Sequence, residues 1–161
     1  MNNDERKKFT MQDNEEVVFS EGPSTINDII PKERDLTTFV DVLRKFADTS
    51  DMIANPDASL TIFAPTNSAF RKLTRKPSQV KDQSEDPTEK LYQFALGHIV
   101  PLAYSSLPDG KEIDTLKNNT RIKVKRNWNG TFKLNGRVNT ISSLKAVNGF
   151  IYKIDSVLEE E

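Results

Sequence analysis

Residues 60–70 constrain the fold more than any other stretch, because their periodicity changes within a few positions. The stretch begins as a short apolar run with β-branched side chains, long enough for one buried strand and too short for a helix. Pro65 ends this run, since it has no backbone N–H to donate to a sheet ladder. Thr66 or Asn67 then offers a side-chain oxygen that can cap a helix with Phe70 on its inner face. The sequence therefore predicts a strand that turns directly into a short helix.

Apolar residues at helical spacing predict two helices before this strand. The first follows a cap at Ser24 or Thr25 and is interrupted by Pro31. The second carries an apolar stripe formed by Leu36, Phe39, Val40, Leu43, Phe46 and Ala47. We expect Asp35 to cap this second helix, and residues 48–59 to form a turn region that leads into the strand.

A polar segment and a third helix follow the central stretch. Residues 75–87 are predominantly polar and predict a surface loop. The third helix is expected to start at Thr88, and its apolar stripe is formed by Leu91, Phe94, Ala95 and His98. Gly97 fits the end of this helix, and residues 99–101 predict a short buried strand.

The last third of the chain has the pattern of a sheet. Residues 120–125 alternate strictly between polar and apolar side chains, which is typical of a strand with one solvated face. Asn-Gly pairs at 129–130 and 135–136 predict tight turns on either side of a short partner strand. Residues 149–157 supply a last, largely apolar strand. Helices followed by a sheet predict an α+β domain.

Composition limits the domain organisation and the chemistry. The chain has 161 residues, enough for one domain with a proper core. Residues 1–23 are rich in Asn, Asp, Glu and Lys, so we expect a mobile polar tail there and a single domain over residues 24–161. The absence of cysteine excludes a disulfide, a thiolate metal site and a cysteine nucleophile. A formal net charge of −1 provides no global field for nucleic acid, and no apolar run is long enough for a transmembrane helix.

Two stretches resemble the signature boxes of the fasciclin-like domain family. The first box runs Thr-x-Phe-Ala-Pro-Thr-(Asn/Asp)-x-Ala-Phe and is matched by Thr61, Phe63, Ala64, Pro65, Thr66, Asn67, Ala69 and Phe70. The second runs Asn-Gly-x-Ile-His-x-Ile-Asp-x-Val-Leu and is matched by Asn148, Gly149, Ile151, Ile154, Asp155, Val157 and Leu158. Between the boxes, His98 stands where the family's central Tyr-His segment has its histidine. The resemblance covers residues 25–158.

This resemblance implies a fold and a general role. The implied fold is a compact wedge, a β-sandwich of about seven strands flanked by several α-helices. Such domains typically occur in secreted or cell-surface proteins that mediate adhesion. We expect the box positions, together with His98 and Tyr152, to be mainly structural, because their residue types are those found in hydrophobic cores and turns.

The chain departs from the family pattern at three places. Tyr152 replaces the histidine of the second box, although an aromatic ring with a polar tip can still pack and donate one hydrogen bond. Gly97 occupies the position of the central aromatic residue. Animal matrix members carry a Pro-Asp-Ile segment before the second box that has been linked to integrins, whereas residues 142–145 of this chain offer no carboxylate. Integrin binding is therefore not supported.

Candidate catalytic and metal-binding residues are scarce. His98 is the single histidine, and a lone imidazole on a helical stripe is more often a hydrogen-bonded core residue than a base or ligand. The sequence contains no Gly-x-Ser-x-Gly elbow and no phosphate-binding glycine loop. We expect no catalytic site, no cofactor and no metal, so the chain is not expected to be an enzyme.

Basic residues and two glycosylation sequons lie in the strand-rich region. Alternation places Arg121, Lys123 and Lys125 on one strand face, where they could attract a polyanion, although a solvated face that protects a sheet edge is the preferred interpretation. Asn118 and Asn129 each begin an N-glycosylation sequon, the second at an expected hairpin tip. Two sequons on surface segments fit a secreted or luminal glycoprotein.

Two functional hypotheses follow. The first is a monomeric adhesion or interaction module that binds a protein or glycan partner, with residues 75–87 and 104–109 as candidate contact loops. It would act at a cell surface, in a matrix or in a secretory or vacuolar lumen, although the polar N-terminus lacks the apolar centre of a secretory signal. The second is a carrier that holds a small apolar ligand in a groove between helices and sheet.

Overall fold

The computed structural model describes residues 24–73 and 86–158 of the chain. The tail expected at 1–23 lies outside the described residues, as does the expected loop 75–87 except for its last two positions. The helices are α1 (Ile26–Ile29), η2 (Ile30–Lys32), η3 (Arg34–Leu36), α2 (Thr37–Lys45), α3 (Ala47–Ala54), α4 (Asn67–Arg71) and α5 (Pro87–Leu96). The strands are β1 (Leu60–Pro65), β2 (Ile99–Val100), β3 (Glu112–Asp114), β4 (Arg121–Arg126), β5 (Phe132–Leu134), β6 (Val138–Ala146) and β7 (Gly149–Ile154).

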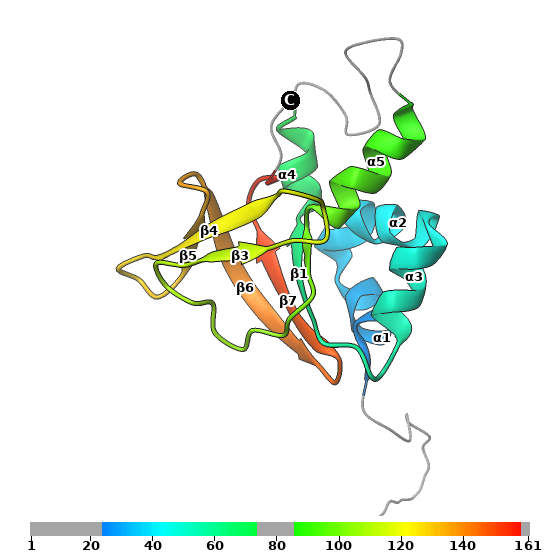
Figure 1. Cartoon of the computed structure of the whole chain (residues 1–161), viewed down its shortest axis with the longest axis horizontal. Coiled ribbons are helices and arrows are strands. Elements are labelled where there is room, and N and C mark those ends of the chain that lie inside the picture. The colour runs from blue at the N-terminus through cyan, green and yellow to red at the C-terminus, as the bar shows by residue number, and fades with distance from the viewer. Residues whose placement is uncertain (1–23, 74–85, 159–161) are drawn as a thin grey trace, which may run out of the picture.

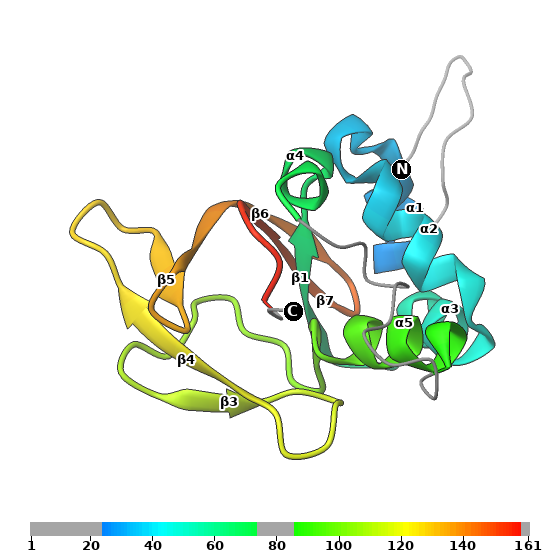
Figure 2. The ribbon, with the colours of Figure 1, turned by 90° about the horizontal axis from the view of Figure 1, so that it is seen from above.

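The seven strands form one mixed sheet in the order β2-β1-β7-β6-β5-β4-β3. Neighbouring strands are antiparallel except for β1 and β7, which run parallel with Ile62 opposite Ile151. The sheet curls, so that β3, β4 and β5 face β1, β6 and β7 across an interior, while the helices pack together on the far side of β1 and β7 (Figures 1 and 2). The predicted α+β class, with about seven strands and several flanking helices, is confirmed.

Strand β1 lies between two hydrophobic cores, which explains why all of its residues are buried. Leu60, Ile62 and Ala64 belong to the core formed with the helices. Phe63 belongs to a second core inside the curled sheet, together with Tyr152. Side chains alternate between the faces of a strand, so a strand covered on both faces is nearly continuous in apolar residues, and Thr61 is the polar exception in β1.

The segment that precedes β1 differs from the expectation. The helix that carries the stripe ends at Lys45, and residues 48–59, expected as a turn region, begin with most of α3. Phe46 adopts an extended backbone between the helices, and its ring packs 5.1 Å from that of Tyr92 on α5. The Thr49 hydroxyl donates to the carbonyl oxygen of Leu43, which satisfies a group at the end of α2. The helical periodicity alone did not reveal this break.

Asp35 does not cap α2, which is a second correction. The N-cap residue is Leu36, and Asp35 lies in η3. Its carboxylate instead accepts a 2.9 Å hydrogen bond from Lys153 Nζ, which also lies 2.7 Å from Glu33 Oε1. These hydrogen bonds raise the pKa of Lys153 against the lowering effect of its partial burial. Asp35 therefore forms an ion pair with Lys153 of β7, which is distant in sequence, and does not cap the helix.

Candidate functional site

The loop that follows β2, residues 101–109, is fixed to the sheet by Thr61. The Thr61 hydroxyl donates to the backbone oxygen of Leu102 at 2.6 Å and accepts from the backbone N–H of Tyr104 at 2.9 Å. Thr61 is fully buried in β1, and both bonds are partly shielded from solvent. A side chain of the first signature box therefore holds the path of an irregular segment.

Tyr152 of β7 holds the same loop from another strand. Its hydroxyl donates to the backbone oxygen of Tyr104 at 2.7 Å. The ring stacks on Phe63 with centroids 5.8 Å apart, and burial raises the pKa of the phenol, which keeps it a donor. The residue that replaces the family's histidine thus has a defined structural partner.

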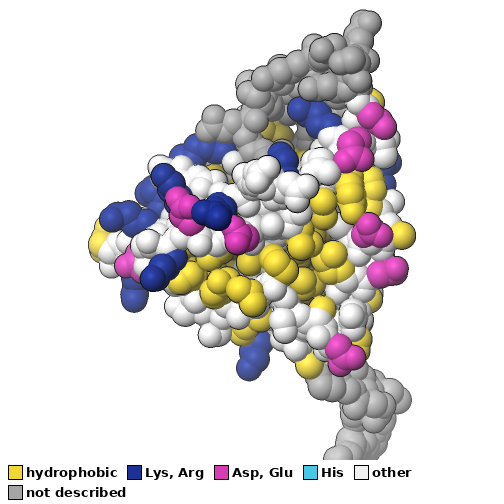
Figure 3. Space-filling view, viewed as in Figure 1, with side chains coloured by type: hydrophobic (Ala, Val, Ile, Leu, Met, Phe, Trp, Pro, Cys, Tyr) yellow, Lys and Arg dark blue, Asp and Glu magenta, His cyan; other side chains and the backbone are white. Residues whose placement is uncertain are grey.

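The loop presents apolar groups to solvent although its backbone is tied down. Leu102 is 57% exposed, and Pro101 and Ala103 beside it are also exposed. Leu107 anchors the far end of the loop in the core inside the sheet. Hydrophobic side chains gather across the middle of the face that carries this loop (Figure 3). The expected contact loop 104–109 is the second part of this segment.

His98 is completely buried just after α5. Its Nδ1 lies 2.8 Å from the backbone oxygen of Phe94, and its Nε2 accepts from the backbone N–H of Leu158 at 3.1 Å. Burial lowers the pKa of the imidazole from 6.5 to about 4, so it is neutral at neutral pH. Both ring nitrogens are occupied by the backbone, which leaves neither one for proton transfer or for a metal.

Other box residues make turns and caps. Thr66 Oγ1 accepts from the backbone N–H of Ala69 and caps α4, whereas the Asn67 amide oxygen accepts from Thr38 on α2. Asn148 is buried and joins α1 and α3 to the turn between β6 and β7. Asp155 accepts from the backbone N–H of Asn139 at 3.0 Å. The apolar box positions Ala64, Pro65 and Ile151 are buried, and Phe70 packs against the helical core.

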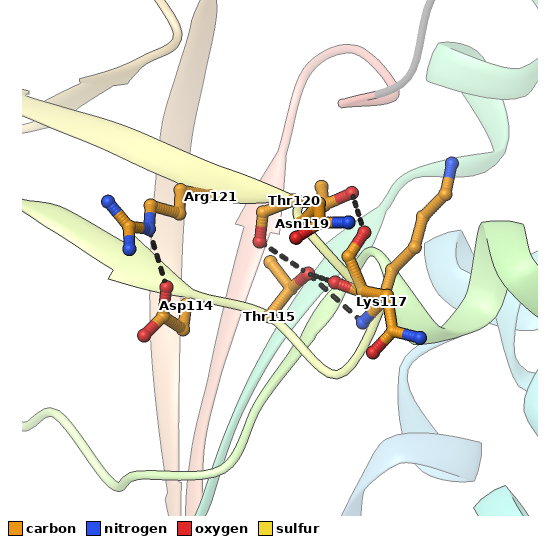
Figure 4. A pocket seen from close by; sticks show the side chains of 7 residues that line it. Asp114, Thr115, Lys117, Asn119, Thr120 and Arg121 are labelled. Carbon is orange, nitrogen blue, oxygen red and sulfur yellow. Dashed lines mark hydrogen bonds and ion pairs between the residues drawn. The ribbon is translucent and has the colours of Figure 1, made fainter.

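The two sequons lie on exposed turns at different edges of the sheet. Asn118 belongs to the 115–120 turn and helps to line a polar pocket of about 410 Å³, where Thr115 and Thr120 bond to neighbouring backbone groups (Figure 4). Asn129 lies in the hairpin between β4 and β5, and its side-chain oxygen accepts from Thr131 Oγ1 at 2.7 Å. Both asparagines are exposed.

The basic strand face divides into two parts. Arg121, Lys123 and Lys125 all point to solvent from β4. Arg121 pairs with Asp114 at 2.8 Å and approaches Glu112 at 3.6 Å, so its charge is balanced by carboxylates of β3. Lys123 and Lys125 instead line a second pocket of about 450 Å³ with Lys111 and Lys133. Basic side chains gather at this end of the molecule, with acidic ones between them (Figure 3).

Sequence reasoning did not identify Leu102 or Lys111 as surface-site residues, and it placed Lys133 in a basic stretch without assigning it to the strand face. Leu102 was detectable as an apolar residue in a segment without strand or helix periodicity, directly after a proline. Lys133 required the register that places it opposite Lys125. Lys111 could be assigned to this surface only from the path of the chain beside β4, where its backbone oxygen accepts a hydrogen bond from the backbone N–H of Val124.

The chemistry available at these surfaces is limited. Within residues 24–73 and 86–158, no group of three or more His, Cys, Asp or Glu side chains could hold a metal ion. No helix in that part of the chain is both long and apolar enough to cross a membrane. The two pockets described above are lined mainly by charged and polar residues, and the hypothesis of a carrier for an apolar ligand in a groove between helices and sheet stays a prediction.

Comparison with known families and structures agrees with this architecture. The model of the Fasciclin domain matches residues 34–160. A solved structure of a FAS1 domain pair from the insect cell adhesion molecule fasciclin I superimposes with a TM-score of 0.60 at 17% identity, over 85% of this chain and 51% of that one. That likeness concerns the fold.

Three curated relatives show the range of proteins that contain similar sequences. A FAS1 domain-containing protein of Aspergillus fumigatus is 26% identical over 86% of this chain and 64% of its own length. Fasciclin-like arabinogalactan protein 11 of Arabidopsis thaliana is 31% identical over 71% of this chain and 44% of its own. Human periostin is 30% identical over 84% of this chain and 16% of its own. The chain therefore spans less than two thirds of each of these relatives.

Proposed function

The chain belongs to the fasciclin domain family, and from that premise we propose that it is a non-enzymatic module that binds a protein partner in an adhesive contact. The proposed setting is a cell surface, an extracellular matrix or the lumen of a secretory or vacuolar compartment. The insect structure with the same fold comes from a cell adhesion molecule, which supports this role. The proposed contact surface is the 101–109 loop.

One observation carries the proposal: a surface loop displays apolar side chains while buried side chains hold its backbone in place. Thr61 and Tyr152 make three hydrogen bonds to the backbone of Leu102 and Tyr104. A loop that is already ordered loses little conformational entropy when a partner binds. Exposed apolar groups such as Leu102 then contribute to binding by leaving water.

The proposal is tested with a charge placed at the centre of the loop surface. Beads coated with the whole chain are measured for attachment to cells of the source organism under flow. Leu102→Asp is expected to weaken attachment by about tenfold or more in Kd, about 1.4 kcal/mol, because it replaces an apolar contact group with a carboxylate that would have to leave water on binding.

Ile141→Asp is the matched control. Ile141 is also exposed, at 53%, but it lies on β6 away from the loop. Circular dichroism and thermal unfolding of both variants verify that the fold is retained. Attachment of the Leu102→Asp beads at the wild-type level, or equal losses in both variants, would exclude the loop as the contact surface.

The two exposed sequons support a luminal or secreted glycoprotein, which belongs to the same proposal. Expression of the chain through a secretory pathway is expected to add glycans at Asn118 and Asn129, since both lie on accessible turns. Glycosidase treatment should then lower the mass in two steps, one of which is lost in Asn129→Gln. A mass that glycosidase does not change would count against this location.

A further inference from the structure

Four lysines from three consecutive segments meet on the outer face of the sheet. Lys123 and Lys125 project from β4 while Ile122 and Val124 between them are buried. Lys133 of β5 stands directly opposite Lys125 in the antiparallel register. Lys111 joins them because the chain before β3 runs beside β4. Together they line one open pocket of about 450 Å³, here called the lysine pocket.

Within the part of the chain that the structure describes, the charges of these four ammonium groups are only partly balanced. Among the described residues, no ion pair links Lys111, Lys123, Lys125 or Lys133 to a carboxylate. Two carboxylates also line the pocket, but both are engaged elsewhere. Glu112 lies near Arg121, and Asp109 Oδ1 accepts from the backbone N–H of Arg126 at 2.8 Å. The lining therefore carries four positive and two negative charges.

The cluster is not explained by protection of a sheet edge, which was the preferred interpretation from the sequence. Strand β4 lies between β3 and β5, so Lys123 and Lys125 are on an interior strand, and the edge is β3. Moreover, like charges directly opposite one another, such as Lys125 and Lys133, destabilise a sheet. Glu112 stands opposite Lys123 and favours that position, but among the described residues the Lys125–Lys133 pair has no carboxylate partner, which indicates an external anion.

We propose that the lysine pocket binds an acidic polysaccharide, as a second contact that rests on the proposed role in adhesion. Lysines act as hydrated point charges on flexible stems, which suits carboxylate or sulfate groups spaced by whole sugar residues along a polymer. Duplex nucleic acid carries a charge about every 1.7 Å, and at that density Asp109 and Glu112 within the pocket would oppose binding.

Trp128 offers a surface for the sugar rings themselves. It is 98% exposed at the tip of the hairpin that joins β4 to β5, the two strands that supply Lys125 and Lys133. An exposed indole face can stack on the apolar face of a pyranose ring, so a long polysaccharide that binds the lysines could also reach Trp128 along the hairpin.

The test measures binding of the whole chain to immobilised heparin and polygalacturonate, which are sulfated and carboxylated probes, over a series of salt concentrations. Lys125→Gln/Lys133→Gln is expected to weaken binding by about tenfold or more and to reduce the slope of log K against log salt by about one per lysine. Lys45→Gln/Lys145→Gln removes the same charge from two exposed lysines outside the pocket and should leave binding unchanged.

Three outcomes would overturn the assignment. One is the absence of salt-dependent binding to both polysaccharides. Another is an equal loss in the two double variants, which would mean that charge acts without a site. The third is tighter binding to single-stranded or duplex DNA than to either polysaccharide at the same salt concentration.

The same variants separate this inference from the proposed function. Bead attachment that still depends on Leu102, combined with polysaccharide binding that ignores Lys125 and Lys133, overturns the lysine pocket alone. Polysaccharide binding that depends on the two lysines, combined with attachment that ignores Leu102, supports the pocket and overturns the protein contact alone.

Discussion

The hydroxyl of Tyr152 donates a 2.7 Å hydrogen bond to the backbone oxygen of Tyr104, and this bond joins β7 to the loop proposed as the contact surface. Thr61 reaches the same loop from β1, which pairs with β7. The order of the loop therefore depends on side chains of the parallel strands β1 and β7. Thr61 and Tyr152 are buried, yet their hydrogen bonds order the exposed 101–109 loop.

Removal of the Tyr152 hydroxyl should loosen the loop while the core stays packed. Tyr152→Phe keeps the ring on Phe63 but leaves the Tyr104 carbonyl without this donor, so we expect a loss of about 1 kcal/mol in the free energy of unfolding. Hydrogen exchange should become faster in residues 101–109. Tyr92→Phe removes an exposed hydroxyl that bonds to Asp48 and serves as the control. Equal exchange in wild type and Tyr152→Phe would show that this bond does not order the loop.

Asn148 should be among the most sensitive polar positions in the core. Its side-chain oxygen accepts from Ile26 N–H at 2.9 Å, and its amide donates to the carbonyls of Ile53 at 2.9 Å and Asn55 at 3.0 Å. Asn148→Ala leaves these buried groups unpaired and should cost about 3 kcal/mol in chemical unfolding. Asn148→Asp keeps the acceptor but places a carboxylate against two carbonyls, so it should not restore stability. A stable Asn148→Asp variant would refute this assignment of the bonds.

Gly149 is expected to tolerate no side chain. It has φ of +151°, and an added Cβ would lie 1.9 Å from the backbone oxygen of Leu60 across the parallel pair. Gly149→Ala should therefore destabilise the fold by about 4 kcal/mol or more. Gly136 also has a positive φ, of +75°, but open space around it, so Gly136→Ala should cost only about 1 kcal/mol. Similar losses in the two variants would mean that backbone strain, not the clash, dominates.

His98 should make stability depend on pH below neutrality. Its pKa is about 4 in the folded chain, lowered by burial from 6.5, so the unfolded state binds more protons between these values. Stability is complete above 6.5 and falls as pH drops toward 4, by about 3 kcal/mol in total. Protonated Nε2 also cannot accept from Leu158. Urea unfolding across this pH range should show a loss of free energy of unfolding in wild type and a smaller loss in His98→Gln. If the free energy of unfolding fell equally steeply with pH in both proteins, His98 would not be its source.

Asn67 should stabilise a helix other than its own. Its amide oxygen accepts from Thr38 N–H at 2.9 Å, and its amide nitrogen donates to Thr37 Oγ1 at 3.0 Å, both in the first turn of α2. Asn67→Ala should cost about 1 kcal/mol, the usual effect of losing a cap. Ser68→Ala, at the exposed neighbouring position, should lie within about 0.5 kcal/mol of wild type. A loss in Ser68→Ala as large as that in Asn67→Ala would contradict the capping role.

In residues 60–70 the local sequence pattern predicts the strand, the turn and the helix, but it does not assign the helix caps. The sequence left Thr66 and Asn67 as alternative caps of one helix, whereas the structure gives Thr66 to α4 and Asn67 to α2. The same limit applies to α2, which ends at Lys45, where Phe46 adopts an extended backbone and packs against Tyr92 of α5. A periodic stripe records which residues are apolar, but not which of several packed elements each one faces.

The sequence by itself determined the family, the α+β class, the buried strand at residues 60–65 and the turns at the Asn-Gly pairs, because these depend on residues adjacent in the chain. Only the tertiary structure decided that Thr61 and Tyr152 hold the 101–109 loop and that Lys111 and Lys133 join Lys123 and Lys125. Those relationships depend on strand register and on the path of a loop, which are set by packing between residues far apart in sequence.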